Sequence, residues 1–509
     1  MHTAVDAMKS RLTQIDDLRR AASVLEWDQQ TLMPAGGAVA RGRQLATLRR
    51  LAHDLETTDE TLRLVDAAGR ETDGRDPGDP DRALYRVGAR KVARARYVSS
   101  ELVGELETHL SASYDAWTRA RPAADFDAMR PYLERTVELS RRWAESFPDA
   151  NHPADPAIAE NDPGMDVAQV RALFADLRKE LVPLVTEIGK APAPDTSFLV
   201  KDYDVDAQLA FGREVVELLG YDFQRGRSDL THHPFMTKFG NGDVRITTRV
   251  QKNDLTDALF STIHECGHAL YEQNIDASFD GTPLDNGTSS GVHESQSRLW
   301  ENIVGRSHAF WEHMLPVARA RFPEQLGDVS VDAFHRAINR VEPSLIRTDA
   351  DEVTYNLHVM IRFDLATALL EGELSVKDLP EAWNARYQAD LGVTAPSATD
   401  GVLQDVHWYV EKIGGLFQGY TLGNVMSAQF YDAACRADSS IPARIGTGDY
   451  APLRRWLVDN LYRHGSVYDP NDLVQRATGE ALSIAPFVRY LKRKFGNLYS
   501  LEFESPAGA

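Results

Sequence analysis

One short segment constrains this chain more than any other: His264-Glu265-Cys266-Gly267-His268, within a stretch that reads as one helix from Asp257 to Gln273. On a helix, residues four positions apart lie one turn from each other, with Cβ atoms roughly 5–6 Å apart. The two imidazoles can therefore bind one metal ion from the same face. Glu265 points about 100° away around the axis, which places it beside such an ion and not on it.

The spacing H-E-x-x-H is typical of zinc peptidases, in which the glutamate is the general base. Leu259, Ile263 and Leu270 recur on a neighbouring face, so the helix can be anchored in a core. Two solvated histidines on a surface helix are the alternative interpretation. The apolar, proline-free character of the helix favours the metal site.

A zinc site of this kind needs a third protein ligand and one position left open. The metzincin spacing requires Gly at 271 and His at 274, where this chain has Tyr271 and Asn274. The other common arrangement places a glutamate on a following helix, and Glu294 lies 26 residues beyond His268 in a segment of helical period. We predict Glu294 as the third ligand; the alternative is a carboxylate that only interacts with a helix N-terminus.

The composition limits the partners. The 509 residues include 56 Lys and Arg against 76 Asp and Glu, a net charge of −20, which argues against nucleic acid and anionic membranes. Met1 to Arg20 lacks the apolar core of a signal peptide, and no run of about 18 apolar residues occurs. Two cysteines, Cys266 and Cys435, exclude a disulfide framework and indicate a reducing compartment. We expect a cytoplasmic protein.

Helical periodicity dominates the chain and predicts a mainly α fold. The expected helices are Ala4–Trp27, Arg41–Thr57, Arg82–Trp117, Phe126–Phe147, Asp166–Lys190 and Asp206–Leu219. Residues 148–163, rich in Pro, Asp and Asn, indicate a boundary. Val244–Val250 alternates and predicts a strand of a small sheet beside the metal helix. We expect a single catalytic unit over 1–509, with an N-terminal helical subregion at about 1–150 and a metal-site subregion at about 200–430.

Five motifs occur in order: D-x-R-x-T at 243–247, H-E-x-x-H at 264–268, H-E-S-Q at 293–296, I-R-x-x-A-D at 346–351 and G-x-x-Q-D-x-H-W at 401–408. In these motifs, and over nearly its whole length, the chain resembles the carboxypeptidase Taq family of zinc metallocarboxypeptidases. One departure is Phe417-Gln418-Gly419-Tyr420, where a Phe-Pro-Thr-Tyr type of sequence is expected.

The resemblance implies removal of single residues from peptide C-termini with broad side-chain tolerance. It also implies a zinc ion, one per chain, a neurolysin-like helical fold with a deep substrate groove, and a homodimer. Co²⁺ is a possible substitute, because helix-borne sites of two His and one Glu accept several divalent ions.

Candidate catalytic residues follow from the chemistry of peptide hydrolysis. Glu265 would take the proton of the attacking water and pass it to the leaving amine. The developing oxyanion needs a donor besides the metal, and Tyr420 and His407 are the candidates. The alternatives are a packing role for Tyr420 and a buried structural role for His407.

An exopeptidase must also bind the terminal carboxylate of its substrate. A planar guanidinium binds carboxylates through two parallel hydrogen bonds, and we predict Arg347 for this role. Its neighbours Asp349, Asp351 and Glu352 make an internal ion pair the alternative. Arg245, on the predicted strand, would border the groove or share in this recognition.

Two rival functions remain. An endo-oligopeptidase on the same fold would not need a residue that binds a terminal carboxylate. A non-catalytic, metal-dependent peptide-binding protein would not need Glu265, so its presence argues against that function.

Overall fold

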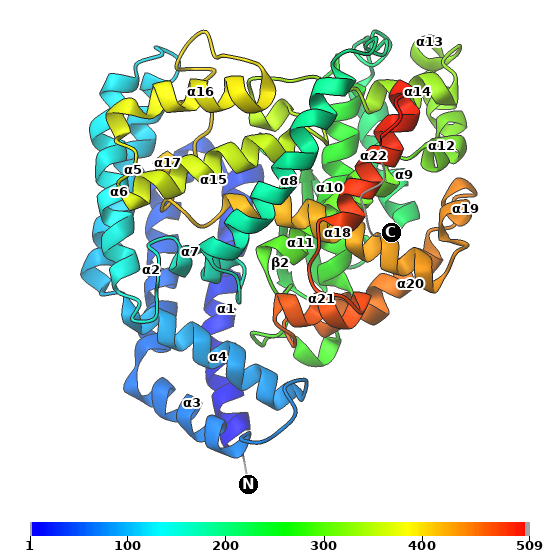
Figure 1. The fold of residues 1–509 in the computed structure, drawn as a ribbon. Helices are drawn as coiled ribbons and strands as arrows, with labels where there is room; N and C mark the ends of the chain where they lie inside the picture. The colour runs from blue at the N-terminus through cyan, green and yellow to red at the C-terminus, as the bar shows by residue number, and fades with distance from the viewer. Residues whose placement is uncertain (1–2, 504–509) are drawn as a thin grey trace. The chain divides into compact units, whose positions relative to one another are not determined.

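A computed structural model describes residues 3–503, which divide into two compact units. Unit 1 consists of residues 3–96, 194–338 and 427–482, and unit 2 of residues 97–193, 339–426 and 483–503. Helices make up most of both units (Figure 1). This confirms the predicted mainly α fold, while the single catalytic unit over 1–509 stays a prediction.

Unit 1 holds a small sheet beside several helices. Its helices are α1 (Ala4–Thr31), α2 (Ala38–Thr57), α3 (Asp59–Glu71), α4 (Pro80–Tyr97, whose last residue belongs to unit 2), α9 (Val205–Leu219), α10 (Leu255–Gln273), α11 (Ser290–Arg298), α12 (His308–Arg321), α13 (Pro323–Leu326), α14 (Val331–Ile338), α19 (Ile441–Gly446), α20 (Ala451–Asn460) and α21 (Pro470–Thr478). A π-helix, η3 (Leu299–Val304), directly follows α11.

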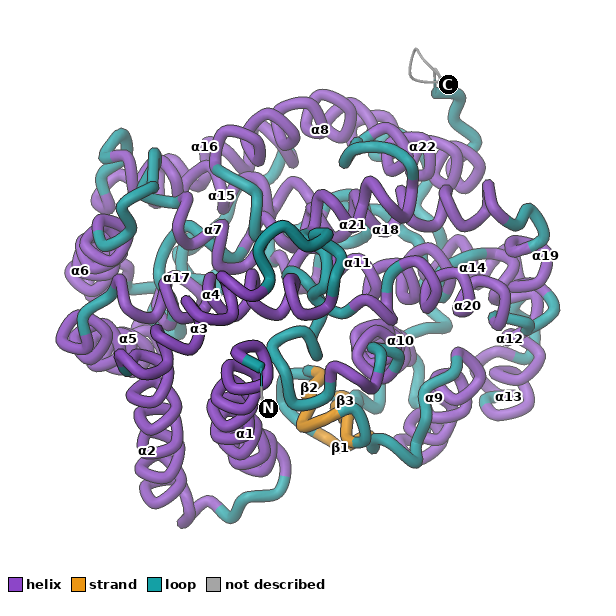
Figure 2. The backbone as a smooth tube through the Cα atoms, turned by 90° about the horizontal axis from the view of Figure 1, so that it is seen from below, coloured by secondary structure: helices purple, strands orange, loops and turns teal. Residues whose placement is uncertain are grey.

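The sheet contains β1 (Ser228–Leu230), β2 (Met236–Gly240) and β3 (Asp243–Thr248), in the order β1-β3-β2. β1 runs parallel to β3, and β2 runs antiparallel to it. Val244 and Ile246 of β3 are fully buried, and both β2 and β3 pack against α10, as Figure 2 shows. The predicted position of a small sheet beside the metal helix is therefore confirmed.

α10 is the central helix of unit 1. Asp254 caps its N-terminus by accepting from the backbone N–H groups of Thr256 and Asp257. Leu259 and Ile263 are buried, as the apolar period predicted. At Gly267, α10 and α11 approach closely: a Cβ there would lie 2.5 Å from the carbonyl oxygen of Gln296 and 2.6 Å from Cα of Ser297.

Unit 2 is helical. Its helices are α5 (Ser100–Ala120), α6 (Phe126–Glu145), α7 (Asp155–Asn161), α8 (Val167–Ile188), α15 (Tyr355–Glu371), α16 (Leu379–Leu391), α17 (His407–Val410) and α22 (Ala485–Tyr499). α18 (Phe417–Ala437) lies in unit 2 up to residue 426 and in unit 1 from residue 427.

Local chain signals explain where the expected helices differ from those found. The predicted helix Arg82–Trp117 is broken between α4 and α5, because Ser99 has extended backbone and its side chain caps α5 by accepting from Leu102 N–H. Residues 148–163, expected as a boundary, contain α7 and lie inside unit 2. α3, β1 and β2 were not predicted.

Within residues 3–503, none of the helices has the length and apolar character needed to cross a membrane.

Candidate active site

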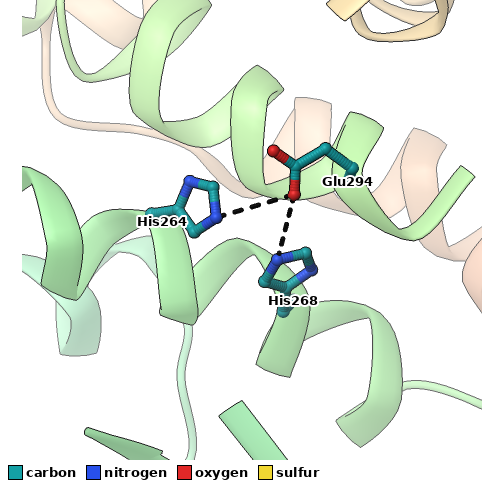
Figure 3. A group of neighbouring side chains, drawn as sticks. All are labelled: His264, His268 and Glu294. Carbon is teal, nitrogen blue, oxygen red and sulfur yellow. Dashed lines mark ion pairs between the residues drawn. The ribbon is translucent and has the colours of Figure 1, made fainter. Parts of the chain in front are cut away.

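Three side chains of unit 1 converge on one point. His264 and His268 lie one turn apart on α10, and Glu294 reaches them from α11 (Figure 3). Oε2 of Glu294 lies 3.6 Å from Nε2 of His264 and 3.4 Å from Nε2 of His268. Among the described residues, these three are the group with metal-ligand chemistry and suitable spacing.

The geometry suits a zinc-sized ion. Ligand atoms 2.0–2.1 Å from a tetrahedral ion lie roughly 3.4 Å from one another. The observed separations match that value, and two imidazole nitrogens with one carboxylate oxygen are a common catalytic zinc set that keeps a fourth position open. The residues present therefore fit a divalent metal ion.

His264 is oriented by a carboxylate behind it. Nδ1 of His264 lies 2.9 Å from Oε2 of Glu301, which belongs to the π-helix η3. Arg298 joins the two carboxylates, because its Nε donates to Glu294 at 2.7 Å and its Nη1 donates to Glu301 at 3.3 Å. A carboxylate on Nδ1 leaves the lone pair of Nε2 for the metal.

Charge compensation keeps the carboxylate of Glu294 ionised. Burial opposes the ionisation of Glu294, but Arg298 and the two histidines outweigh it and hold its pKa below the usual range. Burial is also the largest influence on His268 and lowers its pKa to about 4 despite the neighbouring Glu294. An ionised carboxylate and a neutral imidazole are the forms that bind metal.

Glu265 has the environment of a general base. Its side chain is buried on α10 between the two histidine positions. Burial raises the pKa of Glu265 to about 7, with Glu294 and Glu301 adding to the rise and His264 opposing it. A carboxylate whose pKa lies near neutrality is suited to both accepting and returning a proton.

Arg347 and His407 belong to unit 2, where both contact Asp405. Nε of Arg347 donates to one carboxylate oxygen at 2.6 Å, and Nδ1 of His407 lies 2.5 Å from the other. The fully buried Arg362 lies 3.8 Å from the same carboxylate. Burial opposes the ionisation of Asp405, but Arg362, the hydrogen bond with His407 and Arg347 outweigh it and hold its pKa below the usual range.

Tyr420 lies in the same cluster. The guanidinium carbon of Arg347 is 5.3 Å from the centroid of the Tyr420 ring and 5.4 Å from that of Phe417. Phe417 also contacts the ring of His407. Arg347, His407 and Tyr420 are thus brought together, although they come from three separate motifs.

Arg245 lies on β3 in unit 1. Its guanidinium makes a two-point pair with Asp243, at 2.8 and 2.7 Å. The same group stacks 4.2 Å from the ring centroid of Trp27 on α1 and 4.9 Å from that of Phe239. Its predicted part in bordering a groove or recognising substrate stays a prediction.

Several neighbours of the predicted residues were not found from the sequence. Glu301 and Arg298 stand seven and four positions after Glu294, so helical spacing would have placed them on the same face. Asp405 lies inside a motif that was recognised, but no role was given to it. His293, which contacts His268, stands directly before the predicted ligand.

Comparison with known proteins shows the family of this chain. Residues 7–495 match the family model of carboxypeptidase Taq (M32) metallopeptidases. A crystal structure of an M32 carboxypeptidase from Deinococcus radiodurans R1 is 49% identical, with a TM-score of 0.95 over 98% of this chain and 100% of that one. Thermostable carboxypeptidase 1 of Thermus thermophilus is 42% identical over 95% of this chain and 96% of its own. Carboxypeptidase 1 of Bacillus subtilis is 36% identical over 98% and 100%. The chain therefore belongs to the carboxypeptidase Taq (M32) family of metallopeptidases and is a metallocarboxypeptidase, a peptide hydrolase.

Proposed function

We propose that this enzyme is zinc-dependent and releases single amino acids from the C-termini of peptides with broad side-chain tolerance. The observation that carries the proposal is the convergence of His264, His268 and Glu294, with Glu265 on the same helix as the two histidines. The ligand set matches zinc in number, chemistry and spacing.

When bound, the metal ion would polarise the scissile carbonyl and lower the pKa of a coordinated water. Glu265 takes a proton from the attacking water and donates it to the amine that leaves. Its pKa of about 7 supports both halves of that transfer. Glu265 does not bind the metal, so its role is separable from metal binding by substitution.

Arg347 is proposed to bind the terminal carboxylate of the substrate. Asp405 and the hydroxyl of Tyr355 each take one of its hydrogen bonds. A guanidinium has five N–H donors, so three are left for a carboxylate. Tyr420 and His407 are proposed as donors to the developing oxyanion; because Nδ1–H of His407 bonds to Asp405, its Nε2 donates to that oxygen only when the ring is the imidazolium.

Further properties are proposed from the resemblance to the family and from composition. They are a zinc ion replaceable by cobalt, a homodimer, a deep substrate groove and a cytoplasmic location. Helix-borne sites of this kind accept several divalent ions. The metal content of the protein purified from its native host therefore tests whether zinc is the ion bound.

One experiment tests the proposal directly. A peptide with varied C-terminal residues is incubated with the enzyme, and the products are followed by mass spectrometry before chelation, after chelation and after zinc is restored. We expect a ladder of products that lack one, two or more C-terminal residues, lost on chelation and recovered with zinc.

The same peptide with an amidated C-terminus separates exopeptidase from endopeptidase action. A carboxypeptidase that binds the free carboxylate should leave the amide largely uncut. Internal cleavage of both peptides would support the endo-oligopeptidase, and no cleavage with stoichiometric zinc bound would support a binding protein.

A further inference from the structure

His268 is supported differently from His264. Its Nδ1 contacts another imidazole, that of His293, at 2.6 Å between the two Nδ1 atoms. Nε2 of His293 in turn lies 2.9 Å from Oε1 of Glu272. We infer that His293, held by Glu272, fixes His268 in the tautomer that presents Nε2 to the metal, so that these two residues set the metal affinity. This inference rests on the proposed metal site.

The direction of the hydrogen bonds follows from Glu272. Burial opposes its ionisation, but Lys238 and His293 outweigh it and lower the pKa of Glu272 to about 2. An ionised carboxylate can only accept, so Nε2 of His293 carries the proton. In that tautomer the lone pair of His293 lies on Nδ1 and accepts from Nδ1–H of His268. The remaining lone pair of His268 is on Nε2, the nitrogen that faces Glu294 (Figure 3).

Glu272 is held by charge and by the backbone. Nζ of Lys238, on β2, lies 3.0 Å from Oε2 of Glu272, and both side chains are about 95% buried, with exposures of 5% and 4%. The backbone N–H of Gly287 donates to Oε1 at 2.8 Å. Nζ of Lys238 also lies 2.5 Å from Oδ1 of Asp285, and Oδ2 of Asp285 lies 2.8 Å from Nη2 of Arg20 on α1. Glu272 therefore ends a row of alternating charges formed with Lys238, Asp285 and Arg20, and His293 links it to the candidate metal ligand His268.

Packing fixes the ring of His293 as well. Its ring centroid lies 5.4 Å from that of Tyr271. A Cβ at Gly287 would come within 2.6 Å of Cδ2 of His293. The ring has little room to turn, so its Nδ1 stays directed at His268.

The test measures the affinity of the metal-free protein for Zn²⁺ by competition with a chromogenic chelator. His293→Leu removes the acceptor and should weaken zinc binding roughly 10- to 100-fold, the usual cost of losing such a partner. His293→Asn keeps an acceptor oxygen close to the position of Nδ1, so it should restore most of the affinity, to within about threefold of wild type. A packing role alone would not distinguish these two variants in this way.

Glu272→Gln tests the second step and has a matched control. Glu352 of unit 2 is also a buried carboxylate paired with a buried lysine, Lys494, at 2.6 Å. Glu272→Gln should weaken zinc binding roughly 10-fold or more, whereas Glu352→Gln should leave it unchanged even if both lower the melting temperature of the metal-free protein. If His293→Leu does not fold, as judged by circular dichroism, the inference is tested by comparing the zinc affinities of Glu272→Gln and Glu352→Gln.

Two results would overturn the inference: wild-type zinc affinity in His293→Leu or Glu272→Gln, or an equal loss in His293→Leu and His293→Asn. Glu294→Ala is measured alongside to identify which proposal has failed. If it too binds zinc as tightly as wild type, both the metal site and the inference are wrong. If it loses zinc while His293→Leu does not, only the inference is wrong.

Discussion

Arg347 and Asp405 form a buried salt bridge, with Nε of the guanidinium 2.6 Å from a carboxylate oxygen and both side chains less than 10% exposed. From the sequence, the expected partners of Arg347 in an internal ion pair were Asp349, Asp351 and Glu352. Asp351 instead accepts from Thr354, and Glu352 pairs with Lys494. The internal ion pair therefore exists, but with a residue 58 positions away.

This salt bridge is compatible with substrate binding, because it uses one edge of the guanidinium. If Arg347 binds the terminal carboxylate, Arg347→Lys should not rescue function, since an ammonium cannot make two parallel hydrogen bonds. We expect a loss of roughly 30- to 1,000-fold in kcat/KM, on the order of 2–4 kcal/mol. The measurement is kcat/KM for one peptide as free acid and as amide, in wild type and variant.

The amide is the control in that experiment. It has no terminal carboxylate, so the penalty of Arg347→Lys should shrink sharply with it. Equal losses for acid and amide, together with a lower melting temperature, would mean that Arg347 serves only the internal pair with Asp405.

Glu265→Gln separates catalysis from metal binding. The amide cannot accept the proton of the attacking water, so turnover should fall roughly 10²- to 10⁴-fold. Zinc content and melting temperature should stay close to wild type, because Glu265 is not a ligand. Near wild-type hydrolysis by this variant would refute the assignment of the general base.

Glu294→Ala should instead lose the metal. Two imidazoles alone would remain, and a stable catalytic zinc site uses three protein ligands. Zinc measured by mass spectrometry after extensive dialysis should fall far below one per chain. Glu352→Ala, which removes a buried carboxylate elsewhere, is the matched control and should keep its zinc. Stoichiometric zinc in Glu294→Ala would rule out this ligand.

The free energy of unfolding should depend on pH because His358 titrates differently in the folded and unfolded chain. This residue is fully buried in unit 2, with Nδ1 2.9 Å from the hydroxyl of Tyr387. Burial, with Arg347 and Arg362 nearby, lowers the pKa of His358 from 6.5 to about 3. The unfolded chain then binds a proton between these pH values that the folded chain does not, so stability falls as the pH falls through this window.

Between pH 7.5 and pH 5 this group should cost about 2 kcal/mol of unfolding free energy. His358→Gln has no such proton to gain, so its stability should fall by that much less over the same range. Urea unfolding of both proteins at each pH, at one fixed zinc concentration, gives the difference. Parallel pH profiles would show that His358 titrates alike in the folded and unfolded states.

The grouping of the three candidate metal ligands could be predicted from the sequence because its parts are local. His264 and His268 are related by helix geometry alone, and Glu294 needed only one further helix. The side chains that support these residues could not be predicted from the sequence in the same way. Lys238 reaches the network from β2, and whether a strand meets a given helix depends on the tertiary fold, which no spacing rule supplies.

The cluster in unit 2 shows the same limit. Arg347, His407 and Tyr420 were predicted one by one, each from its own motif and chemistry. Asp405 contacts both Arg347 and His407. This follows from how the chain brings residues 347 and 405 together, and the motif that contains Asp405 does not indicate which residue pairs with it. The break between α4 and α5 was missed for a smaller reason, since Ser99 as a cap was overlooked within a continuous helical period.

The close approach at Gly267 restricts which sequences this fold accepts. Gly267 occupies one of the two positions that H-E-x-x-H leaves open to any residue. Here even a methyl group would collide with main-chain atoms of the neighbouring helix, at 2.5 and 2.6 Å, and no rotamer change relieves a clash with backbone. Alanine at 267 would force apart the helices that carry His264 and Glu294, although the sequence would still contain all three candidate ligands. A pattern search that treats this position as free will therefore accept sequences that cannot assemble this site.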